Sequence, residues 1–177
     1  MKRVFNLLVV DESGSMSIIE RQALVGINET LTTIQKMQKT HKDMEQRVTL
    51  ITFDSTHKKL FYDNVSAHHA KPLKSRDYNP CGGTPLYDAI GMGIAKINAL
   101  TTEDDSVLVT IITDGEENCS EEYNLKMIKN LIERFLIIFR LYSSLQFSSP
   151  SVIIVTNTLS SSVVKALILA MPMPMAS

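Results

Sequence analysis

The chain has 177 residues, of which 44% are apolar and 21% charged, proportions typical of a folded globular domain and not of a disordered segment. Its formal net charge of −1 argues against nucleic-acid binding through bulk electrostatics, and no apolar run approaches the roughly 18 residues that a membrane span needs. Two cysteines are too few for a disulfide framework, which favours a reducing, cytoplasmic location.

The N-terminal segment carries two basic residues followed by a mostly apolar run. A secretion signal starts in a similar way, but no small-residue cleavage site follows here and Asp11 interrupts the apolar run at once. The short stretch from Lys2 to Val10, rich in Val and Leu, therefore predicts a buried strand.

A long helix is predicted from Ser17 to Thr40, because apolar residues recur there at spacings of three and four. These residues are Ile19, Ala23, Ile27, Leu31, Ile34 and Met37. Two strands follow within residues 47–65, and the turn formers between them predict a hairpin that turns at Asp54–His57.

A loop rich in turn-forming residues leads to a helix that begins near Pro85, where proline suits the first turn. The Gly-Met-Gly sequence at 91–93 within this helix indicates tight helix packing. A further strand is predicted over residues 107–113. Residues 119–135 predict another helix, with two acidic residues in its first turn and basic residues later, as the helix dipole favours.

Strands that alternate with helices predict an α/β layered fold with a mostly parallel sheet, and the hairpin supplies one antiparallel edge strand. The length is that of one domain, residues 1–177.

The first strand runs directly into the sequence VVDESGSMS, in which Asp11, Ser13 and Ser15 are spaced two residues apart. In extended backbone this spacing sends all three side chains to one face. Asp114 ends the later strand, and Thr84 lies in a Gly-Gly-Thr loop just before a helix. Because the carboxyl ends of parallel strands meet at one rim, we expect these five residues to lie together.

Two carboxylates and three hydroxyls form an all-oxygen donor set. Such a set suits Mg²⁺ or Mn²⁺ and makes Zn²⁺ or copper a poor fit. Two aspartates balance the charge of the ion, so a vacant coordination position would attract one more anionic oxygen. The sequence therefore predicts a divalent-cation site with an open position.

At these residues the sequence resembles the von Willebrand factor type A (vWA) domain family. The motif of its metal-ion-dependent adhesion site is Asp-x-Ser-x-Ser, a distant Thr and a distant Asp. It is matched here by DESGS (11–15), by GGTPL with Thr84, and by TDGEE with Asp114. TPLYDAI and TDGEEN resemble the compact stand-alone members found in bacteria and their phages. The resemblance covers roughly residues 2–135.

The resemblance implies a three-layer, Rossmann-like fold with helices on both faces of the sheet. It implies a non-enzymatic protein-binding module in which Ser13, Ser15 and Thr84 bind Mg²⁺ directly, while Asp11 and Asp114 act through water or as switching ligands. An Asp or Glu of a protein partner would fill the last position on the ion.

A phosphoacceptor (receiver-like) domain is the competing interpretation, with Asp11 and Glu12 binding Mg²⁺ and Asp54 accepting the phosphoryl group. That fold needs a further strand and helix before Asp54, and a lysine where this chain has Asp114. His57 has the character of an ordinary surface residue. Cys81 and Cys119 fall in loops expected at the metal rim, either as two unrelated thiols or as a redox latch.

The tail, residues 136–177, differs in composition from the rest of the chain. It contains no acidic residue and only two charged ones, Arg140 and Lys165. Residues 151–158 predict a strand and residues 161–171 a short helix. The tail could complete the core, dock on a partner, or be a truncated or frame-shifted end. We expect it to be poorly ordered, because exposed apolar surface without charge favours aggregation.

Overall fold

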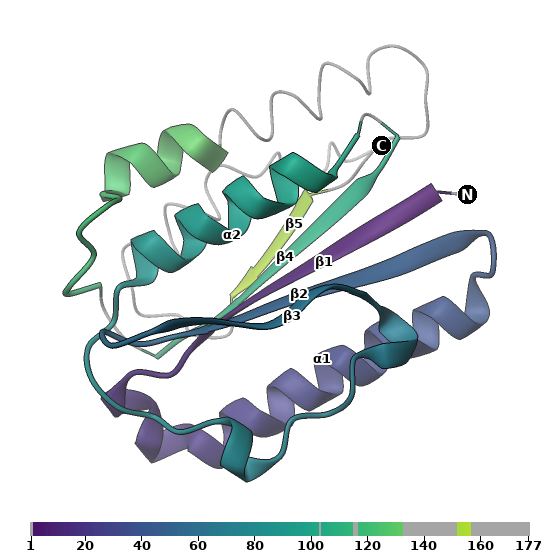
Figure 1. Cartoon of the computed structure of the whole chain (residues 1–177). Helices are drawn as coiled ribbons and strands as arrows, with labels where there is room; N and C mark the ends of the chain where they lie inside the picture. The colour runs from purple at the N-terminus through teal and green to yellow at the C-terminus, as the bar shows by residue number, and fades with distance from the viewer. Residues whose placement is uncertain (1, 103, 115–116, 133–151, 157–177) are drawn as a thin grey trace, which may run out of the picture.

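The computed structural model describes residues 2–102, 104–114, 117–132 and 152–156 (Figure 1). Within these described residues, five strands form one sheet in the order β3-β2-β1-β4-β5. Neighbouring strands are parallel except for the antiparallel pair of β2 and β3 at one edge. The strands are β1 (Lys2–Asp11), β2 (Met44–Phe53), β3 (Lys58–Ser66), β4 (Ser106–Ile112) and β5 (Val152–Thr156). The predicted α/β fold, with a mostly parallel sheet and one antiparallel edge strand, is confirmed.

Helices cover both faces of the sheet (Figure 1). On one face lies α1 (Glu20–Thr40), which the 3-10 helix η1 (Gly14–Ile19) precedes. On the other lie α2 (Leu86–Leu100) and the helical residues 125–132. The central strand β1 serves both layers in alternation: its residues 7 and 9 pack with α2, and its residues 8 and 10 pack with α1. This two-sided burial explains why β1 is apolar at successive positions.

The helix predicted from Ser17 is confirmed, although its first turn is 3-10 and the α-helix begins at Glu20. The predicted stripe is buried at Ala23, Ile27, Leu31 and Ile34, whereas Met37 is 46% exposed, so its placement in the stripe is wrong. Gln38 takes the inward position instead. Its amide accepts a hydrogen bond from Gln46 N (2.6 Å) and donates one to Met44 O (2.9 Å), which satisfies the start of β2.

The second helix begins one residue later than predicted, since Pro85 occupies the N-cap position before Leu86. Its glycines pack tightly, as predicted. A Cβ at Gly93 would lie 3.0 Å from a methyl carbon of Leu7, and a Cβ at Gly91 would lie 2.6 Å from the ring of Tyr123. Leu7 of β1 and Tyr123 of the turn before residue 125 therefore approach the α2 backbone more closely than a side chain at these positions would allow.

The prediction of a helix from residue 119 is wrong at its start, because the helix begins at residue 125. Asn124 caps it by accepting a hydrogen bond from Met127 N (3.0 Å). The preceding backbone is held in a non-helical turn by Asp88 of α2, whose carboxylate accepts hydrogen bonds from the N–H groups of residues 121, 122 and 123. Glu121 and Glu122 thus lie before the helix and not in its first turn.

Residues 152–156 form the strand predicted within the tail, and β5 adds to the sheet beside β4. The short helix predicted over residues 161–171 lies outside the described residues, and so does the rest of the tail. The division into a core and a divergent tail therefore stays a prediction.

Candidate metal site

Asp11 is the last residue of the central strand β1, which lies between β2 and β4 at the point where the strand order changes direction. Ligand sites of open α/β sheets form at such switch points. The Asp11 side chain is fully buried. Its Oδ1 accepts a hydrogen bond from Ser13 N (2.8 Å), and its Oδ2 accepts one from Thr113 Oγ1 (2.6 Å). Burial raises the pKa of Asp11 above its ordinary value, although these hydrogen bonds oppose the shift.

Ser15 contacts both Ser13 and Asp114. The hydroxyl oxygens of Ser13 and Ser15 lie 3.2 Å apart, and Ser15 Oγ donates to Asp114 Oδ1 (2.9 Å). The assumption of extended backbone holds only as far as Ser13, because η1 begins at Gly14. The tight 3-10 turn nevertheless returns Ser15 beside Ser13, so the two hydroxyls still meet.

Thr84 lies on a neighbouring loop and is 2% exposed. Gly14 N donates to Gly82 O (3.0 Å), which places the loop of Thr84 against the loop of the two serines. Gly82 has a φ of +67°, and a Cβ there would lie 2.4 Å from Ser55 Oγ, so only glycine fits. Ser55 Oγ in turn accepts a hydrogen bond from Gly83 N (2.9 Å). The two glycines thus let the Thr84 loop approach its neighbours closely.

Two residues that the sequence analysis did not assign hold this loop in position. Asn118 pairs with the backbone of Thr84: its Oδ1 accepts from Thr84 N (2.8 Å), and its N–H donates to Thr84 O (3.2 Å). The carboxylate of Glu117 accepts from Tyr87 N at the start of α2 (2.9 Å), and from Ser120 N (2.6 Å). An acid at a helix N-terminus complements the helix dipole. Both residues follow Asp114 closely, so the TDGEEN segment was the available signal.

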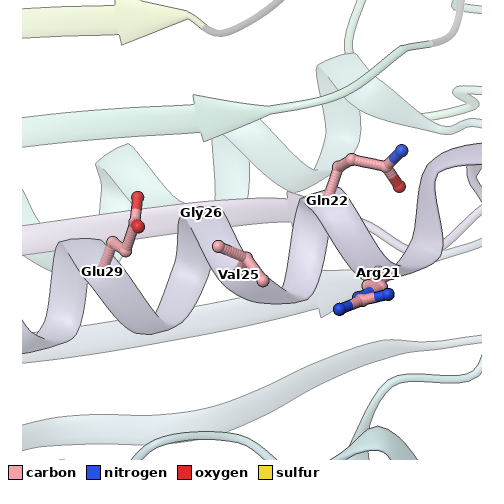
Figure 2. A pocket seen from close by; sticks show the side chains of 5 residues that line it. All are labelled: Arg21, Gln22, Val25, Gly26 and Glu29. Carbon is pink, nitrogen blue, oxygen red and sulfur yellow. The ribbon is translucent and has the colours of Figure 1, made fainter.

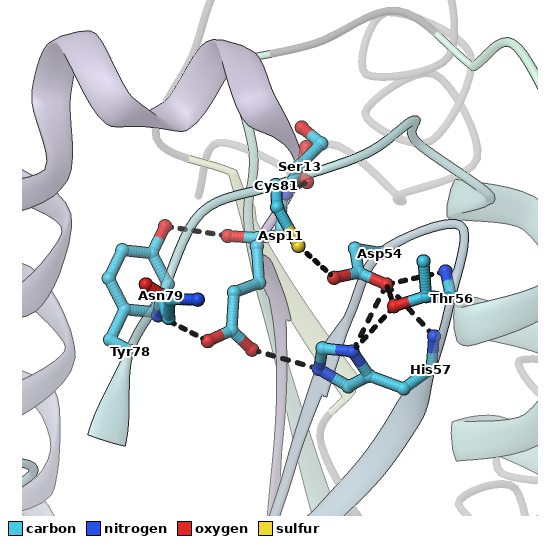
Figure 3. A network of polar contacts seen from close by, with 9 residues as sticks. Asp11, Ser13, Asp54, Thr56, His57, Tyr78, Asn79 and Cys81 are labelled. Carbon is cyan, nitrogen blue, oxygen red and sulfur yellow. Dashed lines mark hydrogen bonds and ion pairs between the residues drawn. The ribbon is translucent and has the colours of Figure 1, made fainter. Parts of the chain in front are cut away.

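A second polar network adjoins the first (Figure 3). Asp54, at the end of β2, is 1% exposed. Its Oδ1 accepts from Thr56 N (2.6 Å) and His57 N (2.8 Å), and its Oδ2 accepts from Cys81 Sγ (2.9 Å). Burial alone would raise the pKa of Asp54, but the hydrogen bonds from Cys81 and Thr56 outweigh it and lower the pKa.

His57 connects two acidic side chains and is not the ordinary surface residue expected from the sequence. Its Nδ1 lies 3.1 Å from Asp54 Oδ1, and its Nε2 lies 3.2 Å from Glu12 Oε2. Glu12 Oε1 also accepts a hydrogen bond from Asn79 N (2.5 Å). Nearby, the hydroxyl of the buried Tyr78 donates to Asp11 O (2.6 Å), which ties this network to the end of β1 (Figure 3).

This geometry does not favour the phosphoacceptor interpretation. Phosphoryl transfer to Asp54 needs an accessible carboxylate oxygen, and both oxygens of this buried side chain already accept hydrogen bonds. The redox latch has little support as well, because Cys81 and Cys119 are free thiols. The hydrogen bond to Asp54 raises the pKa of the Cys81 thiol, and burial raises that of Cys119, so neither thiol is activated.

The donor set at the rim is consistent with a hard divalent cation. Within the part of the chain that the structure describes, no group of three or more His, Cys, Asp or Glu side chains is placed to hold a metal. A cation at this rim would therefore depend on hydroxyl oxygens as well as carboxylates, which is the chemistry of Mg²⁺ and Mn²⁺ and not of Zn²⁺.

Comparison with known proteins supports the fold. No family model matches the sequence, and no curated protein is significantly similar to it. A crystal structure of the pilus adhesin SpaC from Lactobacillus rhamnosus GG is similar, with 25% identity and a TM-score of 0.54 over 66% of this chain and 16% of SpaC. The SpRpn10 VWA domain is similar over 95% of both chains, with 12% identity and a TM-score of 0.55.

The chain thus spans a small part of SpaC but nearly the whole of the SpRpn10 VWA domain. Together with the strand order and the two helical layers, this similarity shows that the chain has a vWA-like fold.

Proposed function

We propose that this chain is a non-enzymatic protein-binding module that uses a bound Mg²⁺ ion to bind an Asp or Glu carboxylate of a protein partner. Asp11, Ser13, Ser15, Thr84 and Asp114 would hold the ion, and Mn²⁺ would suit the same donors. The proposal rests on a series of hydrogen bonds. They link Asp11 to Ser13, Ser13 to Ser15, and Ser15 to Asp114, and so connect the segments that follow β1 and β4.

The bound ion would supply a positive charge with a coordination position for an outside oxygen. The neutral hydroxyls of Ser13 and Ser15 would leave most of that charge for the partner's carboxylate. Asp11 is held by Ser13 N and Thr113 Oγ1 on both of its oxygens. This fixed position supports a role through water for Asp11, because each oxygen keeps one lone pair that can accept a hydrogen bond from a metal-bound water.

Metal binding can be tested without knowing the partner. The electron paramagnetic resonance signal of free Mn²⁺ should fall on titration with the protein and return on addition of Mg²⁺. Ser15→Ala should weaken Mn²⁺ binding by about tenfold or more, while Ser17→Ala, at another exposed serine of η1, should leave it unchanged. Equal affinities of the two variants and the unsubstituted protein would refute the site.

The open coordination position has its own test. Water-proton relaxation by protein-bound Mn²⁺ reports on water bound directly to the ion. A short oligoglutamate peptide should displace this water and reduce the relaxation, whereas an oligoglutamine peptide of equal length should not. If neither peptide changes the relaxation, the proposed capture of a partner's carboxylate is wrong.

The cellular location rests on composition alone. Among the described residues, no helix has the length and apolar character needed to cross a bilayer. We propose a cytoplasmic location because the chain has few cysteines. Fractionation of cells expressing the full chain checks this directly, which is worthwhile because the similar SpaC is a pilus adhesin.

A further inference from the structure

A groove of about 680 Å³ lies next to the proposed metal site. Its lining includes Glu12 and Cys81, which belong to the same loops as the proposed metal ligands, and Lys58, Lys59 and Arg76 on its outer side. Cys81 N donates to Glu12 O (2.8 Å), so the two metal-site loops meet at this end of the groove. A ligand held at the metal could therefore continue into the groove.

The accessible charges of this groove are mainly positive. Lys58 and Lys59 are exposed, and the side chain of Arg76 is 78% exposed. Two of these cations already have a carboxylate nearby: Lys58 Nζ lies 3.4 Å from Asp88 Oδ2, and Arg76 Nε lies 3.9 Å from Asp77 Oδ1. The ammonium of Lys59 lies 4.9 Å from the centre of the Phe61 ring, and among the described residues no carboxylate pairs with it. By contrast, Glu12 is 4% exposed and its carboxylate faces inward.

The inward carboxylates of the groove are already satisfied. Glu12 is held by Asn79 N and lies beside the His57 ring, and both oxygens of the buried Asp54 accept hydrogen bonds. Asp77 accepts a hydrogen bond from Lys74 N (2.8 Å). A visiting ligand would therefore meet the cations of the groove more readily than its anions.

We propose that this groove binds an acidic segment of the protein partner, next to the carboxylate bound at the metal. This inference rests on the proposed function and adds the partner's local sequence character: the carboxylate at the metal would be flanked by further Asp or Glu residues. A polynucleotide fits less well, because the groove offers only three strong cations and the whole chain has a net charge of −1.

A second hollow, of about 480 Å³, lies on the outer face of α1 and has no excess of cations (Figure 2). Its five lining residues all come from one helix, and its single cation, Arg21, is matched by Glu29. The same helix carries exposed Lys36 and Lys39, which provide a matched control for charge reversal away from the groove.

The test measures the fluorescence anisotropy of a labelled oligoglutamate peptide in buffer containing Mg²⁺. The unsubstituted chain should bind it. Lys59→Glu/Arg76→Glu should weaken binding by about tenfold and flatten its dependence on salt, since rim charges act through long-range attraction. Lys36→Glu/Lys39→Glu makes the same change in net charge and should have no effect.

The outcomes separate this inference from the proposed function. If chelator or Ser15→Ala abolishes binding while Lys59→Glu/Arg76→Glu binds as tightly as the unsubstituted chain, the metal site stands and the groove proposal is overturned. If binding survives chelator but fails in the groove variant, the groove proposal stands and the metal function is refuted. Absence of any peptide binding, or tighter groove-dependent binding of an oligothymidylate, would overturn the groove proposal.

Discussion

Asp88, in the first turn of α2, is the residue whose removal we expect to test the tertiary structure most directly. It is 3% exposed, and its carboxylate accepts hydrogen bonds from the N–H groups of Glu121 (3.1 Å), Glu122 (3.0 Å) and Tyr123 (2.9 Å). Lys58 Nζ lies 3.4 Å from the same carboxylate. Asp88 therefore joins α2, β3 and the turn before the helical residues 125–132.

We predict that Asp88→Ala lowers the free energy of unfolding by about 3 kcal/mol. A hydrogen bond to a charged group contributes about 1.5 to 3 kcal/mol, and three such bonds would give more than this value. The sum is reduced because Glu121 and Glu122 are exposed, so water can replace the carboxylate at their N–H groups.

Urea denaturation followed by circular dichroism measures this effect. Asp63→Ala is the matched control, because Asp63 is 57% exposed in its ion pair with Lys96 and should contribute about 1 kcal/mol or less. If Asp88→Ala were no more destabilising than Asp63→Ala, the carboxylate would not hold the turn in place.

The same carboxylate should make stability depend on pH. Burial alone would raise the pKa of Asp88, but the N–H groups of residues 121–123 outweigh it and lower the pKa below the ordinary value of 3.8. A lowered pKa means that the stabilisation is fully present above the unfolded value and is lost as the pH falls through the folded value. The stability difference between the unsubstituted chain and Asp88→Asn should therefore shrink below pH 3.8, and an unchanged difference there would contradict this assignment.

Three further substitutions test other parts of the structure. Gly91→Ala should lower the free energy of unfolding by about 1 to 2 kcal/mol in urea, because overpacking against the Tyr123 ring exceeds the gain in helix propensity. Thr52→Val should raise the melting temperature, with a gain of about 1 kcal/mol, since the buried Thr52 hydroxyl has no hydrogen-bond partner among the described residues. Asn118→Ala should weaken Mn²⁺ binding by about tenfold while retaining the fold, because it releases the backbone of Thr84; unchanged Mn²⁺ affinity would remove Asn118 from the site.

Elements with a strong local pattern were predictable from the sequence. The strand β1 and the helix α1 are long enough for their apolar periodicity to identify them, and the turn at Asp54–His57 identifies the hairpin. Errors arose where a distant side chain decides the backbone. The turn at 121–123 depends on Asp88, more than thirty residues earlier in the chain, so no local pattern of residues 119–135 could reveal it.

The residues of the candidate site also fall into a group that the sequence identifies and a group that it does not. The motif predicted that five residues would lie together. Hydrogen bonds link Asp11, Ser13, Ser15 and Asp114, while the role of all five residues as metal ligands stays a prediction. The contacts that the supporting residues make could not be inferred, because their partners are remote in the chain. Asn118 accepts a hydrogen bond from Thr84, which lies 34 residues earlier in the chain. His57 contacts Glu12, which lies 45 residues earlier.

The amino-acid sequence by itself determined the order of strands and helices and the set of oxygen-bearing side chains, because periodicity and residue chemistry act over short stretches of chain. Only the tertiary structure decided that the helix after Asp114 begins at residue 125. It also decided how His57 lies between two carboxylates and which cations line the groove beside the metal site. Those features depend on contacts between segments that are far apart in sequence, and such contacts exist only once the sheet has assembled.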